Sequence, residues 1–175
     1  MKSFFVKKSK NPKKEFSTHK KLYSMFPSMI TRPIKLKKKY IYLKMYKNKS
    51  LKHFMTTNKF DVSKLVKKVT KMIKEIQRKL PLFRHNDLHI GNIIVDDRKN
   101  LRFTDFEFSS GSGKVLKSFG ITNRYNPRYD LHCFLNSLRS FLIKRRLPVD
   151  VVHRYLPVGY RGKTDKYVKN FRLRF

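Results

Sequence analysis

Two polar segments of this chain carry the residue types that phosphoryl-transfer chemistry needs. The first is His85-Asn86-Asp87-Leu88-His89-Ile90-Gly91-Asn92, and the second is Thr104-Asp105-Phe106. An aspartate beside an incoming hydroxyl can orient it and take its proton, while an asparagine and a second aspartate can hold magnesium ions on nucleotide phosphates. Magnesium prefers oxygen ligands and is usually held by one or two carboxylates plus the substrate's phosphates. The three side chains of Asp87, Asn92 and Asp105 are therefore enough for a magnesium-dependent site.

The residues between the two segments explain how they could meet. Asn92 opens an apolar run that ends at Asp96-Asp97, and the chain returns from Leu101 to Thr104 after the polar turn 98–100. Two apolar runs around a polar turn predict a β-hairpin. Such a hairpin would bring Asp105 back beside Asn92, where one metal ion could contact both side chains. Gly91 would permit a tight backbone next to the asparagine.

The order H-x-D-L-H-x-G-N, followed by D-F-E at 105–107, resembles the protein-kinase-like superfamily. The loop is closest in form to aminoglycoside and choline phosphotransferases. This resemblance implies ATP and Mg²⁺ as cofactors, Asp87 as the catalytic base, and Asn92 and Asp105 as metal ligands. It also implies structural roles for three residues: His85 braces the loop against Phe106, and Asp130 hydrogen-bonds the backbone of the catalytic loop.

The N-terminal region contains a candidate phosphate-binding pair. Residues 3–8 read as a short strand ending in lysines, and Glu15 lies in a stretch with helical apolar spacing. In kinases a strand lysine holds the nucleotide phosphates and is itself fixed by a helix glutamate. Lys7 or Lys8 with Glu15 fits this pairing, and Lys7 is preferred because it follows two apolar residues.

The remaining pattern predicts an α+β chain with a reduced, two-lobed kinase-like fold. A small N-terminal lobe, residues 1–46, would hold a strand, a helix and two further strands over 27–36 and 39–45. By the same resemblance, Met45 and Tyr46 would form the connection between the lobes, which offers backbone groups to adenine in the superfamily. A mainly helical lobe, 47–175, would contain the catalytic loop and the hairpin.

Two long helices are expected in the second lobe. Apolar residues recur at helical spacing from Asp61 to Leu80, where Pro81 ends the pattern, and a second amphipathic stretch begins at Asp130. Ser50 is a candidate helix cap before Leu51. The stretch from Ser109 to Tyr129 corresponds to an activation-like segment, and a short helical turn is expected at 150–155.

The net charge of +33 is extreme, because 44 Lys and Arg face 11 Asp and Glu. Such a surface attracts acidic proteins, nucleic acid or anionic membranes. The lysines are spread along the whole chain, which also fits a coding bias. One cysteine, Cys133, excludes a disulfide framework. The first ten residues contain no signal-peptide-like apolar segment and no run reaches membrane-spanning length, so we expect a reducing, cytoplasmic compartment.

The sequence leaves two classes of phosphoryl acceptor open, small molecules and proteins. The catalytic loop and Glu107, which stands where protein kinases place glycine, point to small-molecule phosphotransferases. Only 45 residues follow Asp130, and an open cationic cleft suits a protein Ser/Thr hydroxyl better, so a protein acceptor is preferred. All six glycines lie at or after Gly91, so no glycine-rich strand pair covers the phosphates. A non-catalytic kinase-like scaffold and a basic nucleic-acid-binding protein are therefore the rival hypotheses.

Overall fold

The computed structural model describes residues 4–47, 49–111, 127–156 and 158–161. Packing divides the chain into two compact units, Met1–Asn58 with Gly91–Ser109, and Lys59–Ile90 with Ser110–Phe175. The hairpin after the catalytic loop therefore packs with the N-terminal sheet. The division into an N-terminal lobe, residues 1–46, and a second lobe, residues 47–175, remains a prediction.

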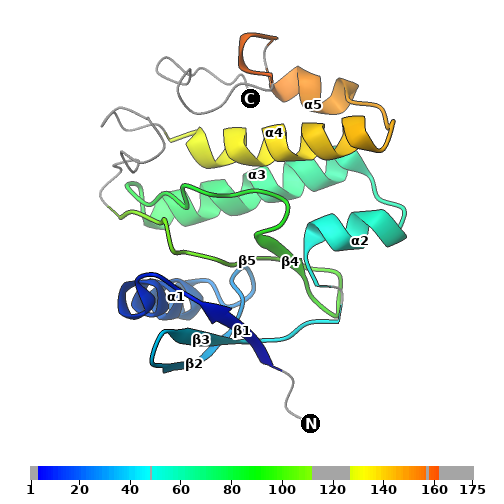
Figure 1. Cartoon of the computed structure of the whole chain (residues 1–175). Coiled ribbons are helices and arrows are strands. Elements are labelled where there is room, and N and C mark those ends of the chain that lie inside the picture. Colours follow the sequence, from blue (N-terminus) through cyan, green and yellow to red (C-terminus); the bar gives the residue numbers. More distant parts are fainter. Residues whose placement is uncertain (1–3, 48, 112–126, 157, 162–175) are drawn as a thin grey trace. The chain divides into compact units, whose positions relative to one another are not determined.

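The first unit is built on a three-stranded antiparallel sheet in the order β1-β3-β2. Its strands are β1 (Phe4–Lys8), β2 (Pro33–Lys37) and β3 (Tyr40–Lys44). Lys7 pairs with Ile41 in the register of β1 and β3. Helix α1 (Pro12–Met25) packs against β2 and β3, and its first position is a proline, as helix N-termini favour. Figure 1 shows α1 beside this sheet.

The predicted hairpin is confirmed as β4 (Ile93–Val95) and β5 (Leu101–Phe103), which pair antiparallel. Asp96 organises its turn, because its Oδ1 accepts hydrogen bonds from the backbone N–H groups of Arg98 and Asn100, at 2.9 and 2.8 Å. Helix α2 (Leu51–Thr57) packs against β4, and Ser50 caps it by accepting from the His53 N–H.

One predicted strand began too early. The strand expected over 27–36 is β2, which starts only at Pro33. The residues before it bond to the hairpin instead: the Thr31 N–H donates to the Phe103 carbonyl at 3.0 Å, and the Phe103 N–H donates to the Met29 carbonyl at 2.7 Å. This segment ties the sheet to the hairpin, and the unit's core fills the space between them with Leu22, Phe26, Ile30, Ile41, Leu43, Ile93 and Phe103.

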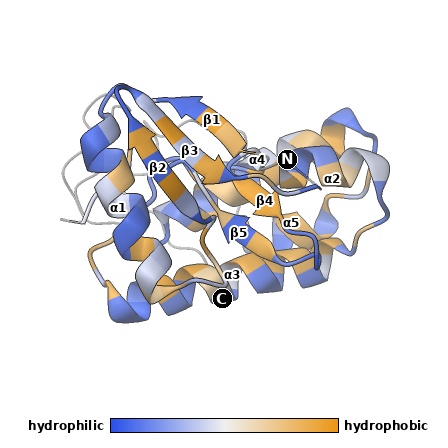
Figure 2. Cartoon of the chain, turned by 90° about the horizontal axis from the view of Figure 1, so that it is seen from below, coloured by the Kyte–Doolittle hydropathy of each residue, from blue (hydrophilic) through white to orange (hydrophobic). Residues whose placement is uncertain are grey.

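The second unit is a packed group of helices: α3 (Val62–Lys79), α4 (Tyr129–Lys144) and α5 (Asp150–Tyr155). Helices α3 and α4 run side by side in opposite directions, and α5 packs against both (Figure 1). Asp61 caps α3 by accepting from the Lys64 N–H at 3.0 Å. Hydrophobic and hydrophilic residues alternate along α3 at helical spacing (Figure 2), and the hydrophobic ones face the core. A short 3-10 turn, η2 (Val158–Tyr160), follows.

These elements confirm the predicted α+β class, with a small sheet and one helix before a helical second part. The helices expected at 61–80, from 130 and at 150–155 are all present. Most of the activation-like segment, residues 112–126, and the basic terminus after 161 lie outside the described residues.

Candidate functional site

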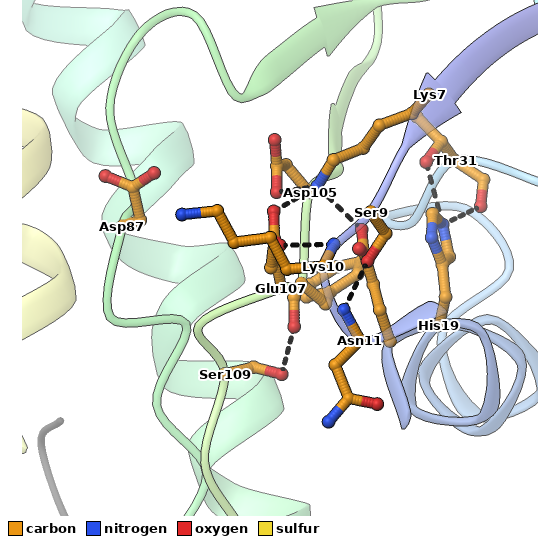
Figure 3. A network of polar contacts seen from close by, with 12 residues as sticks. Lys7, Ser9, Lys10, Asn11, His19, Thr31, Asp87, Asp105, Glu107 and Ser109 are labelled. Atoms are coloured by element: carbon orange, nitrogen blue, oxygen red, sulfur yellow. Dashed lines mark hydrogen bonds and ion pairs between the residues drawn. The ribbon is translucent and has the colours of Figure 1, made fainter. Parts of the chain in front are cut away.

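The strand lysine Lys7 lies among three carboxylates of the first unit. Its Nζ donates to Glu15 Oε1 at 2.9 Å and to Asp105 Oδ1 at 2.5 Å, and it lies 3.3 Å from Glu107 Oε2. Figure 3 shows the Lys7 side chain running from β1 toward Asp105. Lys8, the alternative considered from sequence, is exposed. The strand lysine that pairs with Glu15 is therefore Lys7.

The ion pairs of Lys7 hold it in its charged form. Burial acts to lower its pKa, but hydrogen bonds to Asp105 and Glu15 outweigh burial and raise the pKa above its usual value of 10.5. Glu15 projects from α1 and is 2% exposed. Because a buried carboxylate is costly unless it is paired, this contact fixes both the lysine and the helix.

Asn92 and Asp105 are brought together by the hairpin, as the sequence predicted. The Thr104 N–H donates to the Asn92 carbonyl at 3.0 Å, which places the next residue, Asp105, beside Asn92. Asp105 has a φ of 65°, in the left-handed region that aspartate tolerates better than most residues. Both residues line the same cavity of the first unit. Their amide and carboxylate oxygens are ligands of the hard type that magnesium prefers.

That cavity has a volume of about 460 Å³, within the range of small-ligand sites. Its lining includes the polar side chains of Lys7, Asn92 and Asp105, two further lysines, Lys44 and Lys49, and a set of apolar or aromatic residues: Phe5, Leu43, Met45, Tyr46 and Ile94. Met45 and Tyr46, the expected adenine-binding connection, therefore line the cavity. A lining that combines apolar side chains with cations and oxygen ligands suits a base attached to phosphates.

Tyr46 is held by the hairpin. Burial raises the pKa of its phenol, and the guanidinium of Arg102 lies 5.5 Å from its ring centroid. Arg102 is itself fixed by Asp96, whose Oδ2 accepts from its Nε at 2.9 Å, and by the carbonyls of Pro27 and Ile30. The hairpin of β4 and β5 thus also positions Tyr46, which lines the cavity.

Residues 85–90 of the expected catalytic loop belong to the second unit. The Asp87 carboxylate is about one-third exposed, and the His89 imidazole Nε2 lies 3.7 Å from its Oδ2. Buried Asp130 accepts from the backbone N–H groups of His85 and Asn86, each at 2.9 Å. This is the contact that the family resemblance implied. It supports a loop in which Asn86 has a φ of 67°, a conformation uncommon for residues other than glycine.

The expected contact between His85 and Phe106 remains a prediction, because these residues belong to different units. Both are buried. The Phe106 ring packs edge-on against His19 of α1, with centroids 4.9 Å apart. His19 Nε2 also lies within hydrogen-bond distance of the Thr31 carbonyl and hydroxyl, at 2.8 and 2.9 Å (Figure 3).

Two members of the site were not assigned from sequence. Glu107 was noted only as a departure from protein kinases, but its carboxylate contacts Lys7 and accepts from the Lys10 backbone N–H at 2.8 Å. Thr31, which lines the cavity, gave no signal at all. The rarity of acids in this chain is the signal that could have identified Glu107.

Among the described residues, no group of three or more His, Cys, Asp or Glu side chains forms a metal site. A magnesium ion at Asn92 and Asp105 would therefore need phosphate oxygens to complete its coordination. Within the same residues, no helix combines the length and apolarity that crossing a membrane requires.

Comparison with known proteins agrees with this geometry. Residues 5–126, more than half of the chain, match the model of the choline/ethanolamine kinase family. A protein of Acanthamoeba polyphaga mimivirus, provisionally named a serine/threonine-protein kinase, is 28% identical over 144 residues. That match covers 56% of this chain and 30% of the relative, so the chain spans about a third of its length. On the extent of the family match, the chain belongs to the choline/ethanolamine kinase family and has its protein-kinase-like fold.

Proposed function

We propose that this chain binds Mg-ATP in the cavity of the first unit and transfers the γ-phosphoryl group to a hydroxyl acceptor. The observation that carries the proposal is the contact of Lys7, which lines that cavity, with Glu15 and with Asp105, which also lines it. A strand lysine paired with a helix glutamate, beside an aspartate and an asparagine, matches the arrangement that kinases use to hold nucleotide phosphates and magnesium.

Each residue has a distinct proposed role. Lys7 contacts the phosphates, and Glu15 and Glu107 position Lys7. Asn92 and Asp105 hold the magnesium ion, which neutralises charge on the phosphates when it is bound. The backbone at Met45 and Tyr46 contacts the adenine. Asp87 orients the acceptor hydroxyl and accepts its proton as the oxygen forms its bond to the γ-phosphorus and ADP leaves.

The chain itself limits how far Asp87 can lie from Asn92. Asp87 lies five residues before Asn92, so the backbone between them spans at most about 18 Å. Asp130 restrains the loop just before Asp87, at His85 and Asn86, and the Ser137 hydroxyl restrains it after Asp87 by accepting from the Ile90 N–H at 3.1 Å. A restrained base is what proximity catalysis requires.

We propose a serine or threonine hydroxyl of a protein as the acceptor. The net charge of +33 would attract acidic protein segments and repel a cationic amino alcohol. The name of the mimivirus relative points the same way. Choline or ethanolamine is the second candidate, because the family whose model matches is named for these substrates.

Transfer of ³²P from labelled Mg-ATP to casein, choline and ethanolamine would test the proposal. We expect casein to be labelled, and Asp87→Asn to reduce the rate roughly 10²- to 10⁴-fold, as loss of a general base does. Asp150→Asn, a matched change at an exposed aspartate of α5, should leave the rate unchanged. Labelling of choline or ethanolamine alone would select the second acceptor. No transfer to any acceptor, or equal rates with Asp87→Asn, would overturn the assignment of a catalytic base and favour the scaffold.

A further inference from the structure

A cationic groove in the second unit has no role in the proposed kinase chemistry. It has a volume of about 390 Å³ and lies along α3, with Tyr155 of α5 among its lining residues. The lining residues from α3 are Lys67, Thr70, Lys71, Lys74, Glu75 and Arg78.

The cations of this groove form a row. Lys67, Lys71, Lys74 and Arg78 follow one another at intervals of four, three and four residues, which places them on one face of the helix. At a rise of 1.5 Å per residue, the row extends about 16 Å, with about 4 to 6 Å along the axis between neighbours. All four side chains are exposed.

The row is electrostatically unfavourable in the absence of an anion. Like charges three or four residues apart on a helix repel one another. Among the described residues that line the groove, Glu75 is the one acid, and its Oε1 accepts from Arg78 Nη2 at 2.9 Å. A bound chain of negative charges would relieve this repulsion, and the release of its counterions would add to the affinity.

We propose that this groove binds single-stranded nucleic acid, with the phosphates along the row Lys67, Lys71, Lys74 and Arg78, and with a base against the ring of Tyr155. A linear cationic track beside an aromatic side chain is the arrangement that single-strand binders use. A duplex would present phosphates to the row but no base face to the ring. An acidic peptide would present carboxylates but no base. The groove lies within the second unit, so this proposal does not depend on the kinase assignment.

Fluorescence anisotropy of the whole chain with a labelled 20-nucleotide RNA tests the row. The triple variant Lys67→Gln/Lys71→Gln/Lys74→Gln should weaken binding roughly 10- to 100-fold at 0.1 M salt, and lower the slope of log affinity against log salt by about 2. The control is Lys64→Gln/Lys68→Gln/Lys79→Gln, which removes three exposed lysines of the same helix that do not line the groove. Equal losses from both triple variants would show diffuse attraction and overturn the proposal, as would the absence of binding by the natural chain.

Tyr155 and the competing polyanions test the class of ligand. Tyr155→Leu should weaken binding of the RNA several-fold, and Tyr155→Phe, which keeps the ring, should not. Thermal unfolding of both variants checks that the helices remain folded. A duplex DNA of equal length should bind more weakly, and its affinity should be the same for Tyr155→Leu as for the natural chain. If poly-glutamate binds as tightly as the RNA, with the same dependence on the three lysines, the groove is a site for acidic proteins and the nucleic-acid proposal is wrong.

Discussion

Lys7 and Asp105 are separated by 98 residues of sequence, yet Lys7 Nζ lies 2.5 Å from Asp105 Oδ1. The contact joins the first strand of the sheet to the residue that follows the hairpin. It brings together the lysine and the aspartate that the sequence assigned to the phosphates and to the metal. The predictions below follow from this contact and from the elements that support it.

Replacing Lys7 should separate its structural effect from its effect on the nucleotide. Lys7→Met leaves the buried Glu15 carboxylate without its counter-ion, so we expect the free energy of unfolding to fall by roughly 3 kcal/mol. The double variant Lys7→Met/Glu15→Gln should regain part of that stability. Neither variant should gain thermal stability from Mg-ATP, whereas the exposed neighbour's variant, Lys8→Met, should behave like the natural chain. Stabilisation of the double variant by Mg-ATP would show that Lys7 does not hold the phosphates.

Asp130 should be a major source of stability in the second unit. Its two carboxylate oxygens accept from two backbone N–H groups of the catalytic loop, and the side chain is 3% exposed. Asp130→Ala leaves both donors without this acceptor, so we expect a loss of about 3 kcal/mol in urea unfolding. Asp150→Ala, at the exposed start of α5, should change stability by less than about 1 kcal/mol. A similar effect from the two changes would mean that the loop does not depend on Asp130.

The hairpin should make stability depend on acid. Burial acts to raise the pKa of Asp96, but hydrogen bonds from the Asn100 and Arg98 N–H groups and from Arg102 outweigh it, and the pKa lies below the usual 3.8. A lowered pKa in the folded state gives stability that is present above the unfolded-state value of about 3.8 and is lost as the pH falls through the folded value. As the pH is lowered below about 4, the unfolding midpoint of the natural chain should therefore decrease. Asp96→Asn should be less stable at pH 7 and show a weaker fall. An unchanged fall in Asp96→Asn would assign the acid dependence to other carboxylates.

Local pattern was sufficient for much of the site. The hairpin, the cap at Ser50, and the pairing of a strand lysine with Glu15 depend on residues whose spacing determines their position. The choice of Lys7 over Lys8 also followed from local pattern, because Lys7 comes directly after two apolar residues.

What local pattern missed was determined by tertiary contact. The segment before β2 looks like a strand because it contains apolar and β-branched residues, but its Thr31 and Met29 bond to Phe103 of the hairpin. The role of Glu107 required knowing that the chain turns back toward β1 after Asp105. Neither fact is encoded in nearby residues, because each depends on a partner more than 70 positions away.

Isothermal titration of the chain with ATP, in magnesium and in EDTA, tests the central claim most directly. The account predicts ATP binding that depends on magnesium and is weakened at least about tenfold by Asp105→Asn, in a variant that remains folded. Asp150→Asn should bind like the natural chain. Equal ATP affinity with and without magnesium, unaltered by Asp105→Asn, would contradict the account.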